Sequence, residues 1–219
     1  MTALFPLVFD NPDDVPARLA ALGLRLEVLD ECIMDGRISR AGCTDNDPPS
    51  FPGTTMWAVI TRSLRVRMAS EGWEKSDEDN YSIVLNAPRT LAIAVATGDE
   101  ATGRKNQEPH TKYPKGPATR AAVEANKLQL DLFTPAEPVP VIREAKEPLT
   151  WILLVRPVGS EAYAELSLPL IIGDGGRIEK WRERILLPLS RRGDDGSRIR
   201  RRPPEPGPDI EVAVTRRVS

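Results

Sequence analysis

Trp151-Ile152-Leu153-Leu154-Val155 opens an apolar run, 151–158, whose length and composition are typical of a buried strand. Segments 162–172 and 177–189 alternate or run apolar in the same way, and glycine-rich residues 173–176 supply a tight turn between them. Strands joined by short connections pair antiparallel, so we expect a meander with one face on the core. Segment 210–218 has a similar pattern and is expected to be a further strand.

An earlier pair of segments, 81–85 and 91–96, predicts a β-hairpin. Both are rich in apolar and β-branched residues, and Asn86-Ala87-Pro88-Arg89 has the length and the turn residues that a hairpin connection needs. The sequence leaves open whether this hairpin completes the sheet of the C-terminal meander or belongs to a second sheet.

Helical periodicity comes before these strands. Apolar residues recur at spacings of four and three from Val15 to Ile33, which predicts one helix from Asp14 to about Met34, ended by Gly36. We expect this apolar seam to pack on a sheet; a dimerising coiled coil is the alternative, although the run is shorter than the three or so heptads that it needs. Further expectations are a loop over 37–52, a helix over 56–68 and a short helix over 117–126.

The order of these elements predicts an α+β fold, with N-terminal helices, an antiparallel β-sheet (hairpin plus C-terminal meander) and a proline-rich linker. The 21 prolines gather at 135–148 and 203–208, where a packed element would not accommodate them. We therefore divide the chain into an N-terminal α+β region (1–128), a short peptide with the proline-rich linker (129–148) and a C-terminal antiparallel β region (149–219).

Charge and cysteine content narrow the classes of protein. Lys and Arg number 30, and Asp and Glu number 32, so the net charge is −2 and the chain is not a polyelectrolyte. Two cysteines are too few for a disulfide framework in 219 residues, no run is long enough to span a bilayer, and residues 1–9 lack a basic leader. We expect a cytoplasmic protein without a membrane partner; nothing indicates its oligomeric state.

Signals for catalysis or cofactor binding are weak. Cys32 and Cys43 lack metal-knuckle spacing, and the single histidine, His110, lies in a polar loop rather than beside a nucleophile. No glycine-rich phosphate loop follows a strand. We therefore predict no catalytic residue, no metal ion and no cofactor, and lean towards a protein that is not an enzyme.

Asp99 and Glu100 carry the one catalytic alternative. They follow the strand expected over 91–96, with Lys105 nearby, and carboxylates at a strand end can hold magnesium for phosphodiester cleavage. The simpler interpretation is that these residues form the turn that leaves the strand.

Basic residues in a long polar loop, 97–115, and near the C-terminus are candidates for nucleic-acid contact. Lysine and arginine side chains in loops bind phosphates without reading sequence, so DNA is a candidate partner, bound non-specifically. Solvated surface is the competing interpretation. The candidates are Arg104, Lys105, Lys112 and Lys115, with Tyr113 beside them, and Arg200 and Arg201 in the basic run 198–202.

The peptide 129–133 reads Gln-Leu-Asp-Leu-Phe and lies between the helix expected over 117–126 and the proline-rich segment. It resembles, at every position, the Gln-Leu-Ser/Asp-Leu-Phe consensus by which bacterial proteins bind the sliding clamp (β subunit) of DNA polymerase. A few buried apolar anchors are typical of short-peptide binding. The resemblance implies that Leu132 and Phe133 fill an apolar pocket of the clamp and that Leu130 covers the edge of this pocket. It also implies that Gln129 forms a hydrogen bond at a neighbouring subsite and that Asp131 stays at the rim.

An edge strand is the alternative for this segment, because Leu128, Leu130 and Leu132 alternate with polar residues; Phe133 breaks the alternation. Residues 115–133 also resemble uncharacterised proteins of phages and bacterial integrative elements. We therefore expect a non-enzymatic accessory protein that docks on the clamp, a mobile-element or phage factor acting on replication or repair. A clamp-recruited metal-dependent nuclease or other DNA-processing enzyme is the second expectation, and a purely structural protein that dimerises through the first helix is the third.

Overall fold

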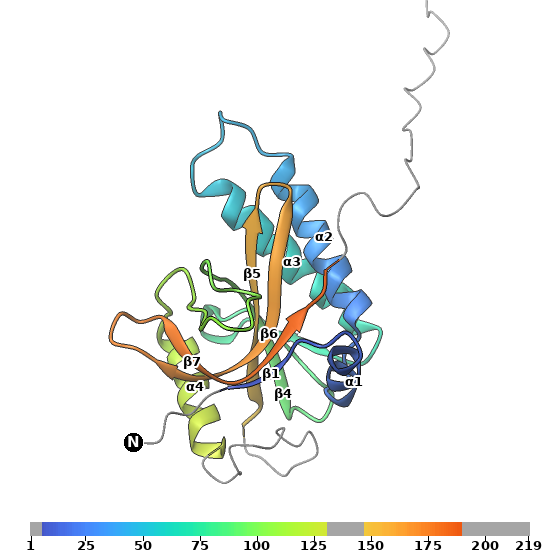
Figure 1. The fold of residues 1–219 in the computed structure, drawn as a ribbon, viewed down its shortest axis with the longest axis vertical. Helices are drawn as coiled ribbons and strands as arrows, with labels where there is room; N and C mark the ends of the chain where they lie inside the picture. The colour runs from blue at the N-terminus through green and yellow to red at the C-terminus, as the bar shows by residue number, and fades with distance from the viewer. Residues whose placement is uncertain (1–5, 131–146, 190–219) are drawn as a thin grey trace, which may run out of the picture.

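The computed structural model of the protein describes residues 6–130 and 147–189. Helices and strands are interleaved along these residues, with three strands between α3 and α4 and three more after α4 (Figure 1). The order is β1 (Leu7–Phe9), α1 (Asp14–Ala21), α2 (Leu26–Ala41), α3 (Phe51–Ala69), β2 (Glu74–Ser76), a short 3-10 helix η1 (Glu78–Asn80), β3 (Ile83–Leu85), β4 (Leu91–Thr97), α4 (Pro117–Leu130), β5 (Leu149–Val158), β6 (Glu161–Ile172) and β7 (Ile178–Leu187).

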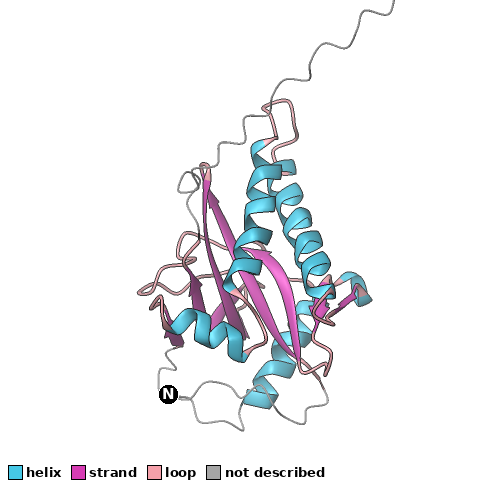
Figure 2. Ribbon diagram, turned by 90° about the vertical axis from the view of Figure 1, so that its right-hand side faces the viewer, coloured by secondary structure: helices cyan, strands magenta, loops and turns pink. Residues whose placement is uncertain are grey.

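The strands form one seven-stranded sheet in the order β1-β7-β6-β5-β4-β3-β2. Figure 2 shows the strands in magenta beside the helices in cyan. The expected α+β class is confirmed, as are the antiparallel hairpin β3–β4 and the antiparallel meander β5–β6–β7. The hairpin and the meander belong to the same sheet, because β4 pairs with β5. That pairing is parallel, as is the pairing of β1 with β7, so the sheet is mixed rather than antiparallel throughout.

The central strand β5 is buried on both faces. Trp151 and Leu153 pack in the core that α1, α2 and α3 share with the sheet, whereas Ile152 and Leu154 pack with Val123 of α4. Successive side chains of a strand point to opposite faces, so a strand covered on both sides needs an apolar residue at every position. The expectation that only one face meets the core is therefore wrong for this strand.

The single helix expected over 14–34 is two helices. α1 ends at Ala21, Gly23 adopts a φ of +72°, which side-chain-bearing residues rarely adopt, and α2 begins at Leu26. The buried residues Val15 and Ile33 therefore lie on different helices. Gly36 does not end a helix, since α2 continues to Ala41, and the loop expected over 37–52 is shorter at both ends because α3 begins at Phe51.

Gly36 lies where α2 packs on α3, and it carries a prediction. A Cβ at this position would lie 2.4 Å from Cγ1 of Ile60, a buried β-branched residue, and 3.1 Å from the carbonyl oxygen of Met56. Overpacking of this kind destabilises a core, so we expect Gly36→Ala to lower the free energy of unfolding by about 1–3 kcal/mol in urea titrations. Gly42→Ala is the control, because its Cβ would meet only ordinary contacts; equal losses for the two variants would contradict this packing.

The two cysteines differ in burial and therefore in expected reactivity. Cys32 is fully buried, and this burial raises the pKa of its thiol, whereas Cys43 is only half-buried. The thiolate is the form that reacts, so we expect iodoacetamide to label Cys43 much faster than Cys32 at pH 8. Mass spectrometry of the folded protein checks this expectation, with urea-unfolded protein as the control in which both thiols react; equal native rates would contradict it.

Three further elements differ from the expectations. β1 and β2 were not predicted, and each has only three residues. α4 runs to Leu130, beyond the expected end at 126, while the helix expected over 56–68 lies within α3. The proline-rich segment from residue 131 to 146 and the strand expected over 210–218 lie outside the described residues. In the part of the chain that the structure describes, the helices are too short or too polar to cross a membrane.

Candidate functional site

The described part of α4 reaches into the peptide 129–133. Gln129 and Leu130 are the last two residues of α4 that the structure describes, and the side-chain amide of Gln129 donates a hydrogen bond of 3.1 Å to the carbonyl oxygen of Ala125. The edge-strand alternative is therefore wrong for Leu128 and Leu130, which are helical. The other three residues of the peptide, Asp131, Leu132 and Phe133, lie outside the described residues.

One buried asparagine fixes α4 just before this peptide. The side chain of Asn126 is fully buried and donates hydrogen bonds to the carbonyl oxygens of Thr150 (2.9 Å) and Pro169 (3.3 Å). Its Oδ1 accepts a hydrogen bond of 2.9 Å from the backbone N–H of Thr150. The helix is thus tied to β5 and β6 at Asn126, whereas Leu128, two residues later, is 65% exposed.

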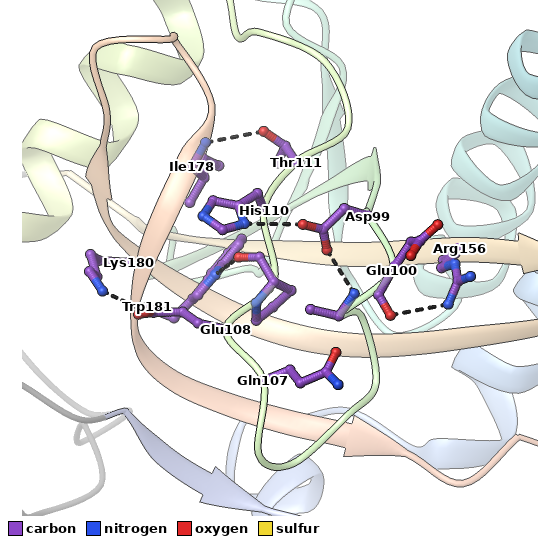
Figure 3. A network of polar contacts seen from close by, with 12 residues as sticks. Asp99, Glu100, Gln107, Glu108, His110, Thr111, Arg156, Ile178, Lys180 and Trp181 are labelled. Atoms are coloured by element: carbon purple, nitrogen blue, oxygen red, sulfur yellow. Dashed lines mark hydrogen bonds and ion pairs between the residues drawn. The ribbon is translucent and has the colours of Figure 1, made fainter.

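The segment 98–116, which connects β4 to α4, follows the sheet without forming a helix or strand of its own (Figure 3). The indole N–H of Trp181 donates to the carbonyl oxygen of Pro109 (2.7 Å), and the backbone N–H of Ile178 donates to Oγ1 of Thr111 (3.1 Å). Within the segment, Nδ1 of His110 lies 3.0 Å from Oδ2 of Asp99. The long polar loop that the sequence predicts is therefore held in place by hydrogen bonds to β7.

A buried ion pair on the sheet also holds this segment. Arg184 of β7 and Glu165 of β6 are 1% and 0% exposed, and their side chains meet at 2.6 and 3.0 Å. The same guanidinium donates to the carbonyl oxygens of Gln107 (2.7 Å) and Arg104 (3.1 Å), and Glu165 accepts from the N–H of Gly103 (2.9 Å). The pair is therefore the main polar anchor between the sheet and this segment.

A cleft of about 610 Å³ opens where β4 and β5 end, between the segment 98–116 and the start of α3. Because β4 and β5 are parallel, their carboxyl ends lie side by side, which is where open sheets that contain parallel strands hold their ligands. The volume is within the range of small-molecule sites. The polar and aromatic side chains of the lining include Arg40 at the end of α2, Trp57 in α3, Arg156 near the end of β5, and Lys112, Tyr113 and Lys115 in the connecting segment.

The charges of the cleft are mainly positive. Its four cations are the side chains of Arg40, Lys112, Lys115 and Arg156, against two carboxylates. Among residues 6–130 and 147–189, no carboxylate forms an ion pair with any of the four. Burial lowers the pKa of the Lys115 ammonium below its usual range, since a cation loses hydration there. An anionic ligand would offset that loss.

Two aromatic side chains are exposed in the same cleft. Trp57 is 39% exposed, and its indole N–H donates a hydrogen bond of 3.1 Å to the carbonyl oxygen of Val95. That carbonyl is accessible because β3 pairs with β4 only over residues 92–94. Tyr113 is 58% exposed, and Nζ of Lys112 lies 5.7 Å from its ring centre. The cleft thus combines cations with partly exposed aromatic side chains.

The structure brings some of the predicted phosphate-contacting residues together and separates others. Lys112 and Lys115 line the cleft. The side chain of Lys105 instead pairs with Asp10 at 2.9 Å, and Arg104 does not line the cleft. Arg200 and Arg201 lie outside the described residues. Sequence reasoning did not select three further lining residues, Arg40, Trp57 and Arg156, because each stands alone in its own element.

Asp99 and Glu100 also line the cleft, as the nuclease alternative requires. Asp99, however, is engaged with His110 and with the N–H of Ala101 (3.0 Å), and the backbone carbonyl of Glu100 accepts from Arg156 (3.1 Å; Figure 3). The described residues contain no group of three or more His, Cys, Asp or Glu side chains placed to hold a metal ion. These contacts agree with the simpler interpretation, in which Asp99 and Glu100 form the turn that follows β4. The side chain of Asp99 accepts the hydrogen bond from the backbone N–H of Ala101 within that turn.

Comparisons with protein-family models, with curated proteins and with solved structures found no match for this chain. The helix end and the cleft are therefore interpreted from their own residues and geometry.

Proposed function

We propose that the protein is a non-enzymatic accessory factor that docks on the sliding clamp of bacterial DNA polymerase through residues 129–133. The observation that carries this proposal is the agreement of the peptide with the clamp-binding consensus at each position. Its placement adds support, because Gln129 and Leu130 belong to α4 and not to one of the seven described strands. We further propose a cytoplasmic mobile-element or phage factor that acts on replication or repair.

Docking of an extended peptide would require the last turn of α4 to open. The exposed side chain of Leu128 does not hold this turn in the core, and helix ends fray readily. Asn126 would keep the rest of α4 on the sheet through the hydrogen bonds between its side chain and the backbone of Thr150. The fold could therefore present Gln129 and the residues after it without losing its core.

A pull-down tests this proposal. The full chain is immobilised and exposed to bacterial lysate, and the retained proteins are identified by mass spectrometry. We expect the sliding clamp among the proteins that the natural sequence retains, and its loss when residues 129–133 are all replaced by alanine. Retention of the clamp by neither protein, or equally by both, would contradict the proposal.

A further inference from the structure

The cleft at the ends of β4 and β5 has a chemistry that clamp docking leaves unexplained. It places the side chains of Lys112 and Lys115 beside those of Arg40 and Arg156, without a carboxylate partner in the described part of the chain. Lys115 is partly buried, so it has lost hydration that no ion pair within the described residues replaces. Such a group favours an anion, and phosphate is an anion that lysine and arginine side chains bind well.

The aromatic side chains narrow the class of anion. Tyr113 exposes more than half of its surface, and Trp57 stays partly exposed while its N–H donates to the carbonyl oxygen of Val95. Exposed aromatic faces next to cations stack nucleic-acid bases while the cations hold the phosphates, an arrangement that is tolerant of sequence. A base is available for stacking only when it is unpaired.

We propose that this cleft binds single-stranded nucleic acid, with phosphates on Lys112 and Lys115 and a base stacked on Tyr113. The inference is independent of clamp docking, since it uses none of the residues 129–133. The sequence has no glycine-rich phosphate-binding loop of the nucleotide-binding type, so recognition depends on side chains. The same holds for proteins that bind along a nucleic-acid strand rather than hold a free nucleotide. Asp99, already bound by His110 and Ala101, offers the ligand a smaller repulsion than a free carboxylate would.

The rigidity of the surroundings distinguishes this cleft from ordinary basic surface. Arg156 is held by the backbone carbonyl of Glu100 and lies 6.0 Å from the ring centre of Tyr163. The backbone N–H groups of Lys112 and Lys115 donate to the carbonyl oxygens of Thr97 (2.8 Å) and Gly176 (2.7 Å). The backbone of Lys112 is therefore held at the end of β4, and the backbone of Lys115 is held at the turn between β6 and β7.

Fluorescence anisotropy with the full chain and a labelled oligothymidylate tests the proposal. We expect the substitution of Lys112→Ala with Lys115→Ala to weaken binding at least tenfold, and Tyr113→Ala to weaken it severalfold. The matched control is Arg104→Ala with Lys105→Ala, which removes two positive charges from the same segment outside the cleft and should change the Kd less than twofold. Circular dichroism establishes that each variant is folded.

Four outcomes would overturn the proposal. They are no binding of the oligonucleotide, equal weakening by the two double variants, tighter binding of duplex DNA than of the single strand, and equal affinity for thymidine monophosphate and the oligonucleotide. The first means that no such site exists, and the second indicates a diffuse basic surface. The third excludes base stacking, and the fourth points to a free nucleotide as the ligand. The double variant of Lys112 and Lys115 should still retain the clamp in the pull-down. Failure of the nucleic-acid proposal is therefore distinguishable from failure of clamp docking.

Discussion

Replacing Arg184 with alanine should lower the free energy of unfolding by about 3–5 kcal/mol, because it leaves the Glu165 carboxylate buried without its partner. The loss extends beyond one ion pair. The carbonyl oxygens of Gln107 and Arg104 would each lose a charged donor, and the segment 98–116 would lose its main polar anchor on the sheet. Urea unfolding followed by circular dichroism measures the change.

The control for this prediction is another ion pair of β7. Lys180 pairs with Glu108 of the same segment, but its side chain is about half exposed. Exposed pairs contribute little, so Lys180→Ala should change the free energy of unfolding by less than about 1 kcal/mol. The loss of unfolding free energy caused by Arg184→Lys should lie between the losses caused by Arg184→Ala and Lys180→Ala. Lysine keeps the charge but cannot reproduce the four hydrogen bonds of the guanidinium. Equal effects of Arg184→Ala and Lys180→Ala would contradict the proposed role of the buried pair.

The joint substitution Leu132→Ala and Phe133→Ala should weaken clamp binding about a hundredfold or more. Burial of a large apolar side chain in a pocket contributes about 1.5–3 kcal/mol, and each 1.4 kcal/mol corresponds to about a factor of ten in Kd. Under the proposal these two side chains are the anchors, so their removal leaves only peripheral contacts. Surface plasmon resonance with purified clamp measures the loss.

The same double variant discriminates docking from core packing. A peptide that is free to bind the clamp contributes little to the fold, so the Tm should stay within a few degrees of that of the natural sequence. A fall in Tm as large as that caused by Arg184→Ala would instead show that Leu132 and Phe133 are part of the core.

Much of the sheet could be predicted because its strands carry a local signal. The apolar run from Trp151 and the turn at residues 173–176 were sufficient for the meander, and the spacing around Pro88 was sufficient for the hairpin. The parallel pairing of β4 with β5 could not be predicted, because it joins residues more than fifty positions apart and leaves no periodicity in either strand. β1 and β2 are too short to carry a pattern.

The helical errors have a different physical cause. Spacings of three and four continue through Gly23 although the backbone turns there, because both helices face the same core. Glycine often ends a helix, but Gly36 lies within α2, where the absence of a side chain gives Ile60 room to approach. A sequence pattern records which residues are buried more reliably than where the backbone changes direction.

The site could be predicted only in part. Lys112 and Lys115 stood out as basic residues in a polar loop, and both line the cleft. Arg40 and Arg156 did not, because their significance depends on where α2 and β5 end relative to that loop. Residues contributed singly by distant elements become recognisable as a site only when the topology of the sheet is known.

Titration calorimetry of the purified clamp with the full chain measures clamp docking most directly. The natural sequence should bind, Asp131→Ala should bind with nearly the same Kd because this residue stays at the rim, and Leu132→Ala with Phe133→Ala should release no measurable heat. No binding by the natural sequence, or undiminished binding by the double variant, would contradict the proposal that residues 129–133 dock this protein on the clamp.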